Sequence, residues 1–258
     1  MSDSHFSLDR LIAHRGLQSS YPENTALSLR KAVEKGAKYI ELDIQFSSDD
    51  LPIIYHDDNL NRVSGHRGNV SEFTRQQLLC IPAHEPDRLG NAFISEKIAP
   101  LDALVDILIE NPQVTAFVEI KEQSIDHCDR DTMLKAVQTI LEPVKRQAVI
   151  ISYDYQLVSA AKNKQWPTVG VVLKQWQDLF SDAVRLIKSE YIFIDYRIIP
   201  DVLDNIDCNE VNLVAYEVGN RYLGNELIAK GFSMLETFEL ENLMAGDKDK
   251  EKIKTFST

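Results

Sequence analysis

The sequence has few cysteines and no long hydrophobic run. Cys80, Cys128 and Cys208 lie far apart without a Cys-x-x-Cys pair, which argues against a zinc knot or a disulfide framework and favours a reducing compartment. No segment approaches the ~18 consecutive apolar residues of a membrane span. The first residues also lack the basic and apolar regions of a signal peptide. We therefore expect a soluble, cytoplasmic protein without a membrane span.

Basic residues are in deficit as well. The 28 lysines and arginines face 40 aspartates and glutamates, which leaves a formal net charge of -12. A field of that sign repels nucleic acids and anionic membrane surfaces, so neither is an expected partner. A small anionic substrate would need local positive charge, and the oligomeric state stays open.

Length and composition are those of a globular protein. The chain has 258 residues, of which 44% are hydrophobic and 26% charged, a balance that excludes disordered, collagen-like and coiled-coil structure. Although domains of about 100 to 200 residues are usual, barrels of alternating strands and helices reach roughly 250 residues as one unit. The length is therefore compatible with one domain or two.

Short strand patterns alternate with amphipathic helix patterns along most of the chain. The expected strands cover residues 11–14, 39–46, 52–56, 115–120, 148–153, 168–173, 191–196, 211–218 and 232–238. The expected helices cover residues 23–35, 101–110, 132–141, 155–164, 176–188, 200–205 and 220–230. Such alternation is typical of βαβ units with parallel strands. Taking 39–56 as one unit gives about eight strands, which predicts a closed (β/α)8 TIM barrel.

A doubly wound open sheet is the alternative arrangement of the same units. Its usual Gly-x-Gly-x-x-Gly turn is absent, because the first strand runs into His14-Arg15-Gly16. Residues 57–99 contain glycine and proline with few apolar runs, and they are too many for an ordinary loop. We interpret them as an insertion in a single domain of residues 1–258, of the kind that forms a lid or a substrate wall.

Two pairs of charged residues stand near the ends of expected strands. Glu41 and Asp43 are two positions apart, so both carboxylates lie on one face, and Glu119 and Lys121 repeat this arrangement. Exposed strand charges or internal salt bridges would explain either pair alone. Inward-facing acids are costly unless a cation neutralises them. Three carboxylates without a cysteine cluster suit a divalent cation such as Mg²⁺ or Ca²⁺ better than zinc.

Two histidines close apolar strand patterns at the same end of the expected sheet. His14 is followed by Arg15, and His56 by Asp57. A lone histidine at a strand end is more often a hydrogen-bonded structural residue, but two imidazoles form a natural general acid and base couple. Arg15 and Lys121 supply positive charge for a phosphate, so the set indicates metal-assisted phosphoester chemistry. The remaining histidines are expected to be exposed in polar loops: His5, His66, His84 and His127.

Five motifs, in order and spacing, resemble the signature of the glycerophosphodiester phosphodiesterase family: Ile12-Ala13-His14-Arg15-Gly16, Pro22-Glu23-Asn24-Thr25, Glu41-Leu42-Asp43-Ile44, His56-Asp57 and Glu119-Ile120-Lys121. The resemblance implies a TIM barrel with a small insertion after the second strand. It also implies hydrolysis of glycerophosphodiesters to glycerol 3-phosphate and an alcohol with a divalent cation.

The family's functional residues carry over onto matching positions. The resemblance implies that the acid and base histidines are His14 and His56, the metal ligands Glu41, Asp43 and Glu119, and the phosphate contacts Arg15 and Lys121. In the family mechanism, the 2-hydroxyl of the glycerol is thought to attack phosphorus and give a cyclic phosphate, which water then opens. Such a tethered nucleophile has an effective molarity of about 10⁵ M or more.

One further motif and two differences from the family's usual sequence lie around these functional residues. Pro22 to Thr25 is interpreted as a structural helix start, with Asn24 or Thr25 as the cap. Tyr216-Glu217 stands where the family usually has tryptophan and threonine, and Leu235-Glu236-Thr237-Phe238 stands where a Thr-Asp pair is common. Neither departure is expected to touch the metal or histidine set. Both lie where the glycerol or alcohol end of a substrate could rest, so Tyr216 is a candidate substrate-binding residue.

Two other functions are compatible with the same residues. A lysophospholipase D type of phosphodiesterase would need an apolar surface near the mouth for an acyl chain, and residues 57–99 offer few large apolar side chains. A catalytically idle barrel could bind phosphodiesters as a sensor. The complete set of acid, base and ligand positions argues against that alternative.

Overall fold

Eight parallel strands form the centre of the computed structural model, which describes residues 7–200 and 211–245. The strands are β1 (Leu11–Ala13), β2 (Tyr39–Phe46), β5 (Thr115–Ile120), β6 (Ala148–Ser152), β7 (Val169–Val172), β8 (Tyr191–Asp195), β9 (Asn212–Tyr216) and β10 (Met234–Thr237). Each pairs with the next, and β1 pairs with both β10 and β2, so the sheet closes. The predicted TIM barrel is confirmed, and an open sheet is excluded.

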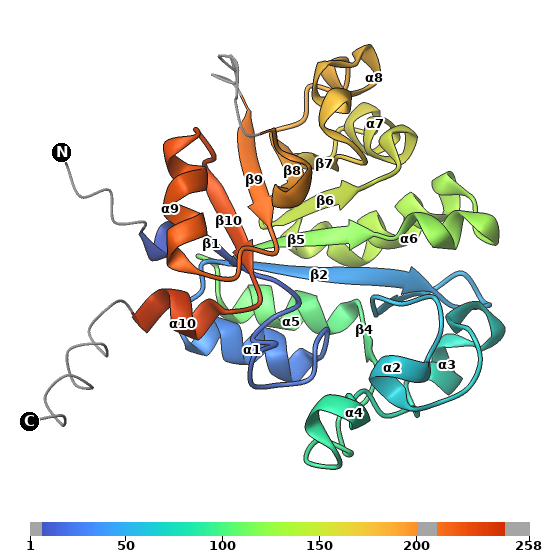
Figure 1. Ribbon diagram of the computed structural model, residues 1–258. Coiled ribbons are helices and arrows are strands. Elements are labelled where there is room, and N and C mark those ends of the chain that lie inside the picture. The colour runs from blue at the N-terminus through green and yellow to red at the C-terminus, as the bar shows by residue number, and fades with distance from the viewer. Residues whose placement is uncertain (1–6, 201–210, 246–258) are drawn as a thin grey trace, which may run out of the picture.

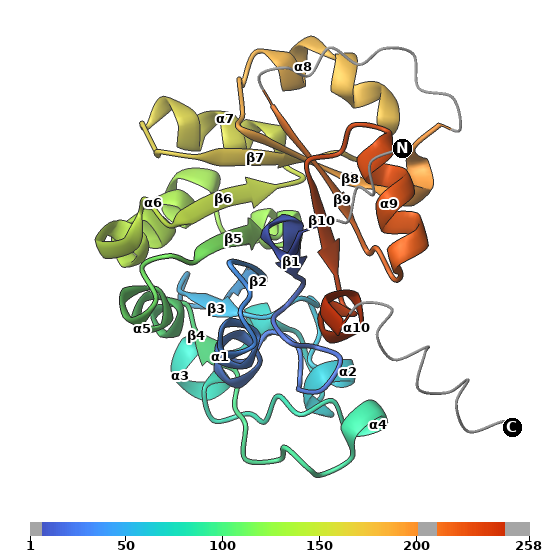
Figure 2. The same ribbon diagram turned by 90° about the vertical axis from the view of Figure 1, so that its left-hand side faces the viewer.

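Helices cover the outside of this barrel, as Figures 1 and 2 show. They are α1 (Ala26–Glu34), α5 (Asp102–Glu110), α6 (Arg130–Leu141), α7 (Tyr155–Asn163), α8 (Asp182–Arg185), α9 (Arg221–Ala229) and α10 (Leu240–Ala245). The single helix expected at 176–188 is divided into a 3-10 helix at Trp176–Phe180 and α8, because extended Ser181 between them caps α8 by accepting from the amide of Val184. The helix expected at 200–205 falls on residues 201–210, outside the described residues.

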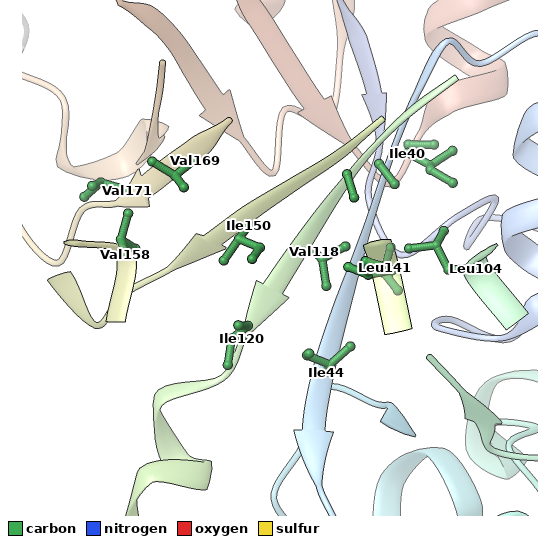
Figure 3. Packing of buried hydrophobic residues seen from close by; sticks show 14 of the residues in the cluster. Ile40, Ile44, Leu104, Val118, Ile120, Leu141, Ile150, Val158, Val169 and Val171 are labelled. Atoms are coloured by element: carbon green, nitrogen blue, oxygen red, sulfur yellow. The ribbon is translucent and has the colours of Figure 1, made fainter. Parts of the chain in front are cut away.

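The strands alternate between two environments. Ile40, Ile44 and Val118 point outward and pack against the helices in Figure 3. The inward positions are apolar over much of the barrel, where Phe117 and Phe193 lie with ring centroids 5.1 Å apart. Toward the carboxyl ends of β2 and β5 the same inward face becomes charged. The barrel interior is therefore a packed core whose polar groups concentrate at one end.

A segment of residues 55–98 lies beside the barrel rather than in its wall. It is bounded by β3 (Pro52–Ile54), which runs antiparallel to β2, and by β4 (Ala99–Pro100), which runs antiparallel to β3. Between them lie α2 (Asn61–Ser64), a 3-10 helix (Val70–Glu72), α3 (Arg75–Leu78) and α4 (Pro86–Leu89). Figures 1 and 2 place this segment on the side of β2, away from α7 and α8.

The 55–98 segment has a small apolar core of its own, which includes Tyr55, Leu60 and Leu78. His84 is buried in the segment, and its backbone amide donates to Val63. The expectation that His84 is exposed is therefore wrong, because a compact segment of this size buries part of its polar sequence. His66 and His127 are exposed as expected, and a ring nitrogen of His127 lies 3.0 Å from the carbonyl oxygen of Phe46. His5 lies outside the described residues.

The described helices are short. Among residues 7–200 and 211–245, none is both long and apolar enough to cross a membrane.

Candidate active site

A polar cavity of about 100 Å³ lies at the carboxyl ends of the barrel strands. It is lined by His14, Arg15, Asp43, His56, Glu119, Lys121, Ile151, Tyr153, Val172, Phe193, Tyr216, Glu217 and Glu236. All but one of the candidate residues from the sequence are among these, and Glu41 lies beside them. The active site of a TIM barrel is found at this end of the strands.

Three carboxylates meet at one side of the cavity. Glu41 and Asp43 project inward from β2, and Asp43 lies opposite Glu119 in the register of β2 with β5. Each is buried and offers an oxygen atom, and these atoms lie within 4.8 Å of one another. Carboxylate oxygens gathered at this spacing are the donor set that Mg²⁺ and Ca²⁺ prefer. The residues therefore fit a divalent cation.

Asp43 is the most firmly held of these acids. Its carboxylate accepts from Asn24 at 2.8 Å and forms ion pairs with Arg15 at 3.0 Å and Lys121 at 2.8 Å. Burial alone would raise the pKa of Asp43, but the charges of Lys121 and Arg15 hold it well below its usual value. Asp43 is therefore an anion in a fixed position.

The two buried cations are held by the same acids. Lys121 Nζ lies 2.7 Å from Glu119 Oε1, and the pKa of Lys121 is raised because Asp43 and Glu119 outweigh the effect of burial. Asp43 likewise raises the pKa of Arg15 against the effect of burial. Both cations remain charged at the cavity wall, where they can contact an anionic phosphate.

A tight turn after β1 directs Arg15 toward the cavity. Arg15 and Gly16 both have left-handed backbone conformations, with φ of 55° and 81°. A Cβ atom on Gly16 would lie 2.6 Å from atoms of Ser28, so only glycine fits against α1. A strained non-glycine residue at such a position is common at functional sites.

The Pro22 to Thr25 motif contributes to the site more than expected. Thr25 caps α1 in a capping box with Ser28, as one of the two alternatives predicted. Asn24 instead has φ of 53° and binds Asp43 twice, since its Nδ2 donates to the carboxylate and its Oδ1 accepts from the backbone amide at 3.0 Å. The purely structural interpretation of this motif is therefore wrong for Asn24.

The two histidines reach the cavity from different elements. His14 follows β1, is 7% exposed and stacks on Phe238 with ring centroids 4.1 Å apart. Its Nε2 lies 3.7 Å from Glu41, and burial together with the charge of Arg15 holds the pKa of His14 well below its usual value. His56 follows β3, and its Nδ1 lies 2.6 Å from the carboxylate of Asp57.

Glu236 is a fourth buried acid that the sequence interpretation assigned to the substrate end. It lines the cavity from β10, is 4% exposed and lies 4.0 Å from Nε2 of His14. Burial and the charges of Glu119 and Asp43 raise its pKa well above the usual value. The expectation that residues 235–238 avoid the histidine set is wrong, because β10 pairs with β1 and brings Glu236 and Phe238 beside His14.

Tyr216 lies at the end of β9, on another wall of the cavity. Its hydroxyl is 2.6 Å from that of Tyr153, and burial raises its pKa to about 12. The next residue, Glu217, has φ of 61° and pairs with Arg197 at 2.8 Å. Tyr216 is therefore a neutral hydroxyl group, tied to a second tyrosine, at the surface of the cavity.

Known proteins resemble this chain in sequence. A model of the glycerophosphoryl diester phosphodiesterase family matches residues 14–213. Human glycerophosphodiester phosphodiesterase 1 is 37% identical over 168 residues, which cover 60% of this chain and 49% of the relative. A glycerophosphodiester phosphodiesterase of Caldanaerobacter subterraneus is 25% identical over 238 residues, which cover 91% of this chain and 96% of the relative. The chain spans about half the length of the mammalian relatives that it matches.

Solved structures share the fold at lower identity. A phosphodiesterase of Oleispira antarctica, described in complex with the product sn-glycerol-3-phosphate, has a TM-score of 0.79 and 20% identity over 92% of this chain and 95% of that one. A glycerophosphodiester phosphodiesterase of Agrobacterium tumefaciens has a TM-score of 0.68 and 19% identity over 90% of this chain and 97% of that one.

Proposed function

The chain belongs to the glycerophosphoryl diester phosphodiesterase family, and from this premise we propose that it hydrolyses glycerophosphodiesters to glycerol 3-phosphate and an alcohol. One observation carries the proposal: three buried carboxylates, two buried cations and two histidines surround one cavity at the mouth of the barrel. The names of the human and Caldanaerobacter relatives and the product in the Oleispira structure support this substrate class. Such an activity belongs to glycerol and lipid metabolism.

The proposed metal ligands are Glu41, Asp43 and Glu119, with Mg²⁺ or Ca²⁺ as the cation. Their support is the shared, buried position of three oxygen donors within 4.8 Å. A divalent cation held there supplies positive charge for the phosphoryl oxygens. Arg15 and Lys121 add fixed positive charge from the chain itself and orient the phosphate.

His14 and His56 are the proposed proton-transfer groups. One imidazole takes the proton of the glycerol 2-hydroxyl as that oxygen bonds to phosphorus, and the other gives a proton to the alcohol oxygen as its bond to phosphorus breaks. Water then opens the cyclic phosphate, and the two histidines exchange roles. Both line the same cavity, which supports the assignment.

The decisive experiment compares a natural diester with an analogue that lacks the 2-hydroxyl. The analogue keeps its phosphate and should still bind and inhibit, because its charge contacts with Arg15 and Lys121 do not involve the missing oxygen. It should turn over at least about 10⁵-fold more slowly, since no tethered nucleophile is present. Comparable turnover numbers for the two diesters would contradict the cyclic route.

A chelator and a substrate panel separate the alternatives. An idle phosphodiester-binding barrel would bind glycerophosphocholine without hydrolysing it, whether or not cation is present. A lysophospholipase D activity has less support, because it needs an apolar surface for the acyl chain of its substrate. In the 55–98 segment, a single large hydrophobic side chain, Ile94, is exposed. Faster turnover of a lysophospholipid than of glycerophosphocholine would nevertheless favour that activity.

We propose a cytoplasmic location and a single-domain organisation for this enzyme. The two described cysteines, exposed Cys80 and buried Cys128, are free thiols, which suits a reducing compartment. β3 pairs antiparallel with β2, and β4 pairs antiparallel with β3, which supports residues 57–99 as an insertion in one barrel domain. The proposed partner is a small-molecule substrate.

A further inference from the structure

An arginine outside the cavity controls the surroundings of His56. We propose that Arg62 is a positioning residue, which acts through Asp57 and Glu23 to fix the ring nitrogen that His56 presents to the substrate. The proposal depends on the proposed function in one respect, the role of His56 as a proton-transfer group. Its structural part concerns the orientation and protonation pattern of one imidazole.

The first step is the contact between His56 and Asp57. Nδ1 of His56 lies 2.6 Å from Oδ1 of Asp57, and His56 lines the cavity. Although burial raises the pKa of Asp57, hydrogen bonds from His56 and Arg62 hold it well below its usual value. An ionised carboxylate only accepts hydrogen bonds. The proton of neutral His56 therefore lies on Nδ1, and Nε2 carries the lone pair that can accept a proton.

The second step is the clamp that Arg62 makes on Asp57. Nε of Arg62 donates to Oδ2 of Asp57 at 2.9 Å, and Nη2 donates to Oδ1 at 2.8 Å. Nη1 and Nη2 also donate to the two carboxylate oxygens of Glu23, both at 2.7 Å. One planar guanidinium thus joins two carboxylates through a fork at each, a geometry that a lysine ammonium cannot reproduce.

The third step is the attachment of Glu23 to the barrel. Glu23 is 1% exposed, and its carboxylate also accepts from Arg15 at 2.9 Å and from Gln18 at 2.8 Å. Arg15 in turn pairs with Asp43 at 3.0 Å. A continuous series of ion pairs, which ends in the hydrogen bond between Asp57 and His56, therefore starts at a proposed metal ligand: Asp43, Arg15, Glu23, Arg62, Asp57 and His56.

This series matters because His56 does not stand on a barrel strand. It follows β3, which pairs with the outer part of β2 and leads into the 55–98 segment. Arg62 lies on α2 within that segment, whereas Glu23 precedes α1 at the barrel mouth. Hydrogen bonds from Tyr55 N–H to Asp43 O and from Gln45 Nε2 to His56 O already tie this backbone to β2, both at 2.9 Å, so the clamp acts on the imidazole. A displacement of about 1 Å at a reacting group can lower turnover about 10²-fold.

Because Arg62 is partly exposed, its effect on His56 can be tested without unfolding the protein. Its side chain is 44% exposed, although the carboxylates of Glu23 and Asp57 that it binds are 1% and 17% exposed, so its replacement leaves no cavity in the core. Glu23 keeps Arg15 and Gln18 when Arg62 is replaced. Loss of Arg62 should therefore leave the fold in place and change mainly the environment of His56.

The test compares Arg62→Gln with Arg88→Gln. Arg88 also joins the 55–98 segment to the residues before α1, since it donates to the carbonyl oxygens of Gln18 and Tyr21 and to Glu85, but it does not touch Asp57. Arg88→Gln is therefore a matched control, because it removes hydrogen bonds between the 55–98 segment and the residues before α1 without removing a partner of Asp57. Long-range ¹H–¹⁵N NMR of the ring nitrogens, assigned with His56→Gln, reads the tautomer in metal-free protein.

We expect neutral His56 to carry its proton on Nδ1 in the wild type and in Arg88→Gln. In Arg62→Gln and Asp57→Asn we expect the Nε2-protonated form to increase. Melting temperatures and circular dichroism check that each variant is folded. A wild-type imidazole protonated mainly on Nε2, or an unchanged tautomer ratio in folded Arg62→Gln, would overturn the proposal.

Kinetics provide the second measurement. With glycerophosphocholine we expect Arg62→Gln to lower kcat about tenfold, which is less than the roughly 10²-fold or larger loss expected when a proton-transfer group is removed, and to leave KM nearly unchanged. Arg62→Lys should not restore kcat, and Arg62→Gln should have no further effect in a His56→Ala background. A full effect of Arg62→Gln in that background would contradict positioning through His56. If the protein hydrolyses no glycerophosphodiester, the proposed function fails, and the tautomer measurement still decides the structural part.

Discussion

The cavity has two unlike walls. On the wall formed by β1, β2 and β5, Asp43 has three charged or amide partners and Lys121 binds two carboxylates. On the wall formed by β9 and β10, Tyr216 bonds to one other tyrosine, and Glu236 lies 4.0 Å from Nε2 of His14, an imidazole whose pKa is lowered. Charge is thus held rigidly on one wall and weakly on the other.

This difference shows where the site is organised before a substrate arrives. Fixed charges that need no rearrangement stabilise a transition state more than mobile ones do. Substitutions on the β1, β2 and β5 wall should therefore affect turnover most. Those on the β9 and β10 wall should act more on stability and on substrate binding.

The largest effect is expected from Asp43→Asn, which keeps the shape of the side chain and removes its charge. We expect turnover to fall about 10³-fold, because a metal ligand and the partner of Arg15 and Lys121 are altered together. Metal affinity measured by calorimetry should fall as well. Asp106→Asn on the exposed face of α5 is the control and should behave as the wild type. Full turnover in excess chelator would contradict the metal hypothesis.

The next largest effect is expected from the histidines. His14→Ala and His56→Ala should each lower kcat by about 10²-fold or more, the usual scale of general acid and base catalysis. Because both act in one step, the double variant should lose much less than the product of the single losses. Exposed His66→Ala provides the control. If either single variant kept a kcat near that of the wild type, the replaced histidine would have a structural role and not a catalytic one.

A smaller effect, on stability, is expected from Glu236→Gln in metal-free protein. Burial raises the pKa of Glu236 in the folded state, so the folded protein holds a proton that the unfolded chain releases. Stability is therefore lost as pH rises from about 4.5 through the folded-state pKa. The variant should be about 1–3 kcal/mol more stable at pH 7, the cost of a poorly paired buried polar group.

Thermal unfolding at several pH values measures this difference. One kcal/mol corresponds to about 2–4 °C in Tm for a chain of this size. Exposed Glu226→Gln on α9 is the control and should shift stability by less than about 0.5 kcal/mol. A melting temperature of Glu236→Gln below that of the wild type throughout the pH series would show that the carboxylate stabilises the folded protein.

The smallest effect is expected from Tyr216→Phe. The variant loses one hydroxyl, whose hydrogen bond to Tyr153 contributes about 0.5–1.5 kcal/mol to stability. If the hydroxyl also contacts substrate, KM should rise about fivefold with kcat unchanged, since one hydrogen bond of ground-state binding is lost. Tyr222→Phe, which changes an 82% exposed side chain, should alter neither. A loss of kcat comparable to that of the histidine variants would contradict the comparison between the walls.

Much of the fold could be predicted from local pattern. The bounds of β2 and β5 agree with the expected strands at both ends, because apolar and polar side chains alternate along β2 and β5 is a short apolar run. The division of the helix at Ser181 was missed, since hydrophobic periodicity continues through a residue that caps a new helix. The two-residue strand β4 was also missed, because its pairing with β3 leaves almost no pattern in the sequence.

The site could be predicted where its residues share neighbouring strands. Glu41, Asp43 and Glu119 follow from strand alternation and from the register of β2 with β5. The approach of Glu236 to His14 was missed because it depends on which strands close the barrel. One signal was available: Glu236 is two positions from Met234, so the two side chains share the inward face of the strand. The clamp of Arg62 on Asp57 depends on the path of the 55–98 segment, which no local pattern specifies.

Closure of the barrel by β1 and β10 has a consequence for how the protein is made. The proposed catalytic and metal-binding residues have all been synthesised once the chain reaches Lys121, yet Leu11 pairs with Leu235 near the other end of the chain. Until β10 is synthesised, nascent β1 lacks its final neighbour and the parallel sheet has an exposed edge. Glu236 and Phe238 therefore reach the side of His14 only when the last strand docks, and until then the site stays open to water on that side.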